Sequence, residues 1–84
     1  MVVVSEQPVV MMYSRRRCGL CDQARAVIEA ELDRGDFSFR EIFIDGDDGL
    51  EQEYGLRVPV VEVNAVEEFE FVVDPDRLRA LVRG

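Results

Sequence analysis

Two cysteines are the residues of this chain whose type and spacing could perform chemistry. They stand three positions apart in Cys18-Gly19-Leu20-Cys21. An apolar run precedes them and a helical pattern follows, so the pair is predicted to lie where a strand passes into the first turn of a helix. Two cysteines at positions i and i+3 of such a turn can approach closely enough to form an intrachain disulfide.

The first cysteine is predicted to ionise readily. Free N–H groups and the helix dipole at the start of a helix favour negative charge, which stabilises a thiolate over a thiol. Arg15, Arg16 and Arg17 directly precede Cys18, and nearby guanidinium groups act in the same direction. Such settings lower the pKa of a cysteine from about 8.5 to roughly 3.5–7.5. Because the thiolate is the nucleophile of disulfide exchange, we expect Cys18 to attack a substrate disulfide.

The second cysteine is predicted to complete the exchange. Cys21 shares a helix face with Ala24 and Ile28, so it should be more buried and more protonated than Cys18. We expect it to attack Cys18 in the mixed disulfide and release the reduced substrate.

Composition excludes several other kinds of chemistry. The chain has no His, which excludes Cys–His and Ser–His–Asp catalysis and any histidine-bound metal site. All ten positive charges are Arg, and the net charge of −8 argues against nucleic acid or an anionic membrane as the main partner.

Length and hydropathy predict one cytoplasmic domain spanning residues 1–84, with residues 1–7 as a loose leader. No apolar run approaches the roughly 18–20 residues needed to cross a bilayer, and the start lacks the basic and apolar regions of a secretory signal. Most thiols are kept reduced in the cytoplasm. We expect a monomer.

Hydrophobic periodicity predicts an α/β fold in the order β-α-β-α-β-β-α, with a four-stranded mixed sheet flanked by helices. Asp74 is predicted to cap the last helix, with Pro75 at its first position. The preceding elements are strands over 8–13, 37–44, 60–63 and 69–72, a helix over about 18–33 and a short helix over 50–54.

Three other interpretations of the cysteine pair stay open. Cysteines are often small buried hydrophobic residues, although packing explains this spacing at a strand-to-helix junction poorly. Zinc and iron–sulfur sites usually take about four ligands, so a single chain supplies too few; a [2Fe–2S] cluster shared by two chains, or completed by glutathione thiols, would meet that need. The disulfide could also regulate the binding of a partner protein.

The order of motifs resembles the thioredoxin fold, and more closely the short glutaredoxin-like proteins of that superfamily. The resemblance rests on the segment from Tyr13 through Cys18-Gly19-Leu20-Cys21 to Ala24 and on Val58-Pro59 before the hairpin, and it covers residues 8–84. It implies a thiol–disulfide oxidoreductase acting in electron transport and cell redox homeostasis. It implies no metal or prosthetic group, protein disulfides or glutathione mixed disulfides as substrates, and glutathione or a thioredoxin-reductase-type protein as electron donor.

The resemblance also implies substrate-binding residues around the cysteines. The Val58–Pro59 bond is expected to be cis and to face the cysteines, with the backbone of Val58 holding the substrate chain. The resemblance implies an acidic group that binds the amino end of glutathione, which Asp74 or Asp76 could supply. Apart from the resemblance, the positive charge of Arg15, Arg16 and Arg17 is expected to attract acidic partners or glutathione carboxylates. The chain departs from glutathione-using relatives because bulky Val72 and Val73 stand near the position of their Gly-Gly pair.

Overall fold

The strand that leads to the cysteines lies inside a mixed four-stranded sheet. The computed structural model describes residues 7–35 and 37–83. Residues 1–6 of the predicted leader lie outside this part of the chain. The elements in order are β1 (Val9–Ser14), α1 (Gly19–Leu32), β2 (Ser38–Phe43), α2 (Asp48–Tyr54), β3 (Val60–Val63), β4 (Val66–Glu70) and α3 (Pro75–Arg83).

The sheet has the order β2-β1-β3-β4. β1 pairs in parallel with β2, and β3 runs antiparallel to both of its neighbours. The crossover through α1 makes the parallel pair possible, since parallel neighbours cannot be joined by a tight turn. The predicted order of elements and the mixed four-stranded sheet are confirmed.

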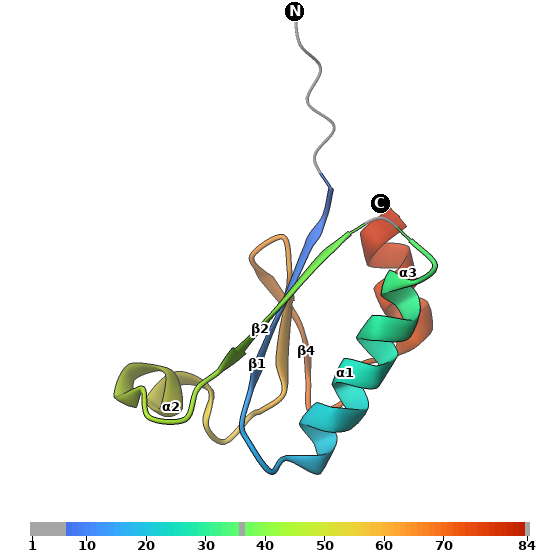
Figure 1. The fold of residues 1–84 in the computed structure, drawn as a ribbon. Coiled ribbons are helices and arrows are strands. Elements are labelled where there is room, and N and C mark those ends of the chain that lie inside the picture. Colours follow the sequence, from blue (N-terminus) through green and yellow to red (C-terminus); the bar gives the residue numbers. More distant parts are fainter. Residues whose placement is uncertain (1–6, 36, 84) are drawn as a thin grey trace, which may run out of the picture.

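Helices α1 and α3 lie side by side over one face of the sheet (Figure 1). Side chains alternate along a strand, so Val10, Met12 and Ser14 of β1 all lie buried on that face. Ile28 of α1 and Leu78 of α3 are fully buried against them. This core fixes the start of α1 close to the end of β1, where the two cysteines lie.

The last strand differs from its prediction over 69–72, because β4 starts at Val66 and ends at Glu70. It starts earlier because Asn64 and Ala65 both take positive φ, of 51° and 68°, and form a tight two-residue connection from β3. It ends earlier because Phe71 also has a positive φ, of 69°, which an extended strand does not contain.

Helix α2 contacts the sheet through Tyr54, on the face opposite to α1. Tyr13 points to that face, and its ring stacks on Tyr54 with centroids 4.0 Å apart and planes inclined by 11°. Burial raises the pKa of Tyr54 to about 12. The Nε atom of Arg15 donates to the Gly55 carbonyl at 3.2 Å, and its guanidinium lies 3.4 Å from Glu51. These contacts attach α2 to the loop before Cys18.

A partly buried ion pair joins α1 to α3. The Glu31 side chain is only 7% exposed and accepts two hydrogen bonds from Arg79, at 2.9 and 2.8 Å. Hydrogen bonding to Arg79 holds the pKa of Glu31 below its usual value. Because both carboxylate oxygens are bonded, burial of this charge is compensated.

No helix in the described part of the chain combines the length and the apolar character that a membrane span requires.

The ion pair between α1 and α3 predicts a pH dependence of stability. The folded pKa of Glu31 lies below the unfolded value of about 4.5, so its contribution is present above that pH and is lost as the pH falls through the folded pKa. We expect Glu31→Gln to lower the urea midpoint more at pH 7 than at pH 3. Glu29→Gln, at an exposed position of the same helix, is the control. Equal losses at both pH values would contradict the prediction.

The attachment of α2 predicts a stability role for Arg15. Arg15→Gln should lower the free energy of unfolding by about 1 kcal/mol, because it removes the charged donor to Gly55. Arg17→Gln, at an exposed position of the same loop, should change it by less than about 0.5 kcal/mol. Urea unfolding of the oxidised protein measures both. The prediction fails if the two variants are equally stable.

Candidate active site

The side chain that caps the start of helix α1 is that of a cysteine. Cys18 is the N-cap residue, with extended backbone at φ −119° and ψ 107°, and its Sγ accepts a hydrogen bond from the Cys21 N–H at 3.1 Å. Ser, Thr, Asp or Asn usually supplies this acceptor through oxygen. Here the sulfur of Cys18 occupies the end of the helix where free N–H groups favour negative charge.

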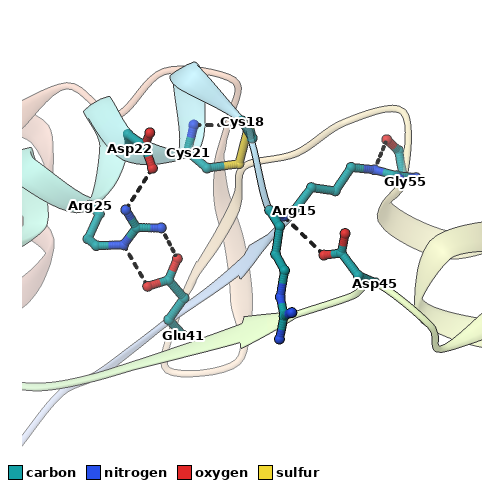
Figure 2. Close-up of a disulfide and its surroundings, with 9 residues drawn as sticks. Arg15, Cys18, Cys21, Asp22, Arg25, Glu41, Asp45 and Gly55 are labelled. Atoms are coloured by element: carbon teal, nitrogen blue, oxygen red, sulfur yellow. Dashed lines mark hydrogen bonds and ion pairs between the residues drawn. A yellow bond between two sulfur atoms is a disulfide. The ribbon is translucent and has the colours of Figure 1, made fainter.

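The two cysteines form a disulfide across this first turn (Figure 2). Their Cα atoms are 5.2 Å apart, within the range that a disulfide spans. Cys21 is completely buried, whereas Cys18 is partly exposed. The predicted difference in burial is confirmed, since Cys18 is the more exposed residue of the pair.

An ion-pair network lies beside the disulfide, centred on Arg25 of α1 (Figure 2). Arg25 donates to both carboxylate oxygens of Glu41 on β2, at 2.7 and 2.6 Å, and to Asp22 at 2.8 Å. Glu41 is 15% exposed, and its hydrogen bonds from Arg25 lower its pKa. The same bonds raise the pKa of Arg25. One guanidinium thus offsets two carboxylates next to the cysteine pair.

The three arginines before Cys18 differ in their placement. The Arg15 side chain extends toward Gly55 and away from the disulfide (Figure 2). The backbone N–H of Arg16 donates to Asp45 at 3.0 Å, and its guanidinium lies 5.9 Å from the centre of the Phe43 ring. Arg17 is exposed and has a φ of 56°. Their expected roles toward a substrate stay predictions.

Val58 and Pro59 lie at the same end of the sheet as the cysteines. Val60 is paired with Tyr13, which places Pro59 level with the end of β1. The Val58–Pro59 bond is cis, which confirms that part of the prediction. The Pro59 carbonyl accepts a hydrogen bond from the Phe71 N–H at 2.9 Å. The expected contact of Val58 with a substrate chain stays a prediction.

Asp74 lies at the start of α3 and caps it. Its Oδ1 accepts a hydrogen bond from the Asp76 N–H at 3.1 Å, and α3 begins at Pro75 as predicted. The side chain is exposed, so one carboxylate oxygen serves the helix while the residue still faces solvent. Its expected role toward glutathione stays a prediction.

Sequence reasoning missed the residues that surround the cysteines from other elements. The Arg25–Glu41 pair joins α1 to β2, and no local pattern in the sequence reports such a pairing. The sequence pattern places Phe71 in a strand, although it lies in a turn bonded to Pro59. Within residues 7–35 and 37–83, no three His, Cys, Asp or Glu side chains are grouped as metal ligands.

Solved structures of known proteins share this fold. Protein XcR50 from X. campestris is 40% identical, covers 88% of this chain and 95% of its own, and superposes with a TM-score of 0.71. Protein Ne2328 from Nitrosomonas europaea is 27% identical over 98% and 99% of the two chains, with a TM-score of 0.78. A mutant thioredoxin from Halobacterium salinarum NRC-1 is 27% identical over 92% of this chain and 73% of its own, with a TM-score of 0.64.

No curated protein matches the chain. The sequence model of one protein family matches the chain, and the match spans nearly all of the described residues. The family is described as Glutaredoxin-like domain (DUF836), and the match covers residues 9–83. Together with the mixed sheet and the disulfide at the start of α1, this shows that the chain has the thioredoxin fold and belongs to the glutaredoxin-like domain family.

Proposed function

We propose that this protein is a thiol–disulfide oxidoreductase in which Cys18 attacks the substrate and Cys21 resolves the mixed disulfide. One observation carries the proposal: Cys18, a partly exposed residue at the N-cap of α1, is joined by a disulfide to Cys21, a completely buried residue one turn later. The pair can therefore exist as a disulfide, and an incoming molecule is expected to reach the more exposed residue, Cys18. The thioredoxin fold of the chain and its glutaredoxin-like family support the same chemistry.

The proposed reaction has two exchange steps. The Cys18 thiolate of the reduced protein attacks one sulfur of the substrate disulfide, a mixed disulfide forms, and the other substrate sulfur leaves as a thiolate that takes a proton from water. Cys21 then loses its proton, and its thiolate attacks the Cys18 sulfur. This step forms the Cys18–Cys21 disulfide and releases the second substrate thiolate. Two electrons pass to the substrate, and a thiol or dithiol reductant must restore the pair.

The start of α1 supplies the electrostatic basis for the first step. In the reduced protein the Cys21 N–H is placed to donate to a Cys18 thiolate, as it donates to the Cys18 sulfur in the disulfide. A hydrogen bond to the charged form favours that form, and the 14-residue helix adds its dipole. Arg25 offsets the opposing charge of Asp22 in the first turn.

The proposed oxidoreductase also needs a substrate class, a compartment and an electron donor. We propose protein disulfides in the cytoplasm as substrates, with glutathione or a thioredoxin-reductase-type protein as electron donor. No resident metal or prosthetic group takes part in either exchange step. The net charge of −8 supports a protein or small thiol rather than a nucleic acid as partner.

The two cysteines predict different kinetic phenotypes. Cys18→Ser should reduce the dithiothreitol-dependent reduction of insulin to background, because it removes the nucleophile. Cys21→Ser should still react through Cys18 but should accumulate as a mixed disulfide with the substrate, since the resolving sulfur is absent. Mass spectrometry of the intact protein detects that adduct. Unchanged activity of Cys18→Ser would refute the mechanism.

Arg25 predicts an effect on the reactivity of Cys18. Arg25→Gln leaves the carboxylates of Asp22 and Glu41 without their shared partner, and this negative charge disfavours the Cys18 thiolate. We expect the midpoint of the pH-dependent alkylation rate of Cys18 to rise by about one pH unit in this variant.

Arg40→Gln is the matched control for charge, because Arg40 lies exposed on β2 next to Glu41 in sequence. It should leave the alkylation midpoint of Cys18 within about 0.3 pH units of the wild-type value. The same shift in both variants would mean that total charge, rather than the Arg25 network, sets the reactivity.

A further inference from the structure

Ser14 is a polar residue on a face of β1 that is otherwise apolar. It is completely buried at the end of the strand, and its Oγ has no hydrogen-bond partner among residues 7–35 and 37–83. Val10 and Met12, on the same face, are apolar core residues. A buried hydroxyl that loses its bonds to water and gains none destabilises the folded state, whereas an alanine at this position would not. The packing of the core therefore does not explain why a serine stands here.

The first turn of α1 lies over the end of β1 that carries Ser14. The chain leaves β1 at Ser14 and enters α1 at Gly19, and α1 then runs back along the sheet (Figure 1). The side chains that α1 buries against the sheet therefore follow β1 in reverse, and Cys21 is the first of them. Cys21 and Ser14 are both completely buried. The Cys21 sulfur thus lies in the same part of the core as the Ser14 hydroxyl.

The other acceptors near Ser14 already have their hydrogen bonds. The Cys18 sulfur accepts from the Cys21 N–H. Both carboxylate oxygens of Glu41 accept from Arg25. These hydrogen bonds from Arg25 lower the pKa of Glu41, and the nearby Ser14 hydroxyl lowers it further without meeting the geometry of a hydrogen bond. Glu41 is therefore a competing acceptor whose two oxygens are occupied.

Opening the disulfide changes what the Cys21 sulfur can offer to a hydroxyl. In the disulfide this sulfur carries no proton and is a weak acceptor. As a thiol it becomes a donor, and as the thiolate of the resolving step it is a strong acceptor, since charge-assisted hydrogen bonds are about twice as strong as neutral ones. Reduction therefore supplies the partner that no described residue gives to the Ser14 hydroxyl in the oxidised protein.

We propose that Ser14 is a positioning residue of the redox pair, and that its hydroxyl hydrogen-bonds to the Cys21 sulfur only after the disulfide opens. The inference rests on the proposed exchange at Cys18 and Cys21, because it names a residue that tunes that same reaction. A hydrogen bond that is present in one redox state alone stabilises that state. Ser14 therefore shifts the equilibrium toward the dithiol, so a thiol donor recycles the disulfide more readily and the dithiol is a weaker reductant.

Equilibration with glutathione measures this shift. Two glutathione thiols reduce the protein: the Cys18–Cys21 bond breaks, each cysteine sulfur takes one proton, and one glutathione disulfide forms. We expect Ser14→Ala to lower the equilibrium constant of this reaction about tenfold, which corresponds to a potential about 30 mV more negative. Acid quenching, alkylation of free thiols and mass spectrometry distinguish the reduced, oxidised and glutathionylated protein. Ser38→Ala, the same change at an exposed serine of β2, should leave the constant unchanged.

The stability of the two redox states is a readout that a structural role of Ser14 would not produce. Ser14→Ala should raise the urea midpoint of the oxidised protein, because it removes an unpaired buried hydroxyl. It should lower the midpoint of the reduced protein, because it removes a hydrogen bond. Loss of packing alone, or of a contact with Glu41, would change both forms equally and leave the glutathione equilibrium as it is. Equal changes in both forms would therefore overturn the inference.

Two cysteine variants identify the sulfur that the hydroxyl contacts. In reduced Cys18→Ala the Cys21 thiol remains, so the addition of Ser14→Ala should lower the urea midpoint as it does in the reduced wild type. In Cys21→Ala the partner is gone, so Ser14→Ala should raise the midpoint or leave it unchanged. The opposite pattern would assign the hydrogen bond to Cys18 and overturn the assignment to Cys21.

Failure of this inference and failure of the proposed function give different results. A Ser14→Ala variant with the wild-type glutathione equilibrium would overturn the role of Ser14 but leave disulfide exchange at Cys18 intact. A wild-type disulfide that neither glutathione nor dithiothreitol opens would refute both the exchange reaction and the role of Ser14.

Discussion

The hydrogen bond from the Cys21 N–H to the Cys18 sulfur is the interaction on which the rest of the site depends. It makes a sulfur atom the N-cap of α1, at 3.1 Å from the Cys21 amide nitrogen, and so couples helix formation to the chemistry of one cysteine. A capping oxygen only stabilises a helix, whereas a capping sulfur also changes its own tendency to ionise. The same turn brings the second sulfur within bonding distance and buries it.

The remaining structure holds that turn in place and balances its charge. The core between the sheet and the two helices fixes the start of α1 at the end of β1. Arg25 binds two carboxylates beside the cysteines and offsets their charge, in a chain whose net charge is −8. Arg15 stabilises the attachment of α2, so the three successive arginines do not share one function. Contacts between elements thus balance the charge beside the cysteines and attach α2, and the three successive arginines do not do this as one cluster.

Much of the fold was predictable because its signals are local. The apolar run before Cys18, the helical period after it and the Asp74-Pro75 cap each depend on neighbouring residues, and the structure confirms these elements. The cysteine pair was predictable for the same reason, since its spacing of three residues is close to one helical turn. The cis bond at Pro59 was predictable only from the resemblance, because most such bonds are trans.

The surroundings of the cysteines were not predictable, because they depend on contacts between elements. The sequence does not distinguish Glu41 from other glutamates in strands. Only the packing of α1 against β2 brings Arg25 within hydrogen-bonding distance of it. Phe71 fits a strand by propensity, but its bond to Pro59 and its positive φ place it in a turn beside a pocket. Tertiary contacts override local propensity at such positions.

The central claim is that the start of α1 stabilises Cys18 as a thiolate, and a pH titration of the reduced protein by thiolate absorbance tests it most directly. The account predicts that one cysteine ionises with a pKa within roughly 3.5–7.5, that this transition disappears in Cys18→Ser, and that Cys21 ionises at higher pH. A Cys18 pKa of about 8.5, the value of free cysteine, would contradict the account.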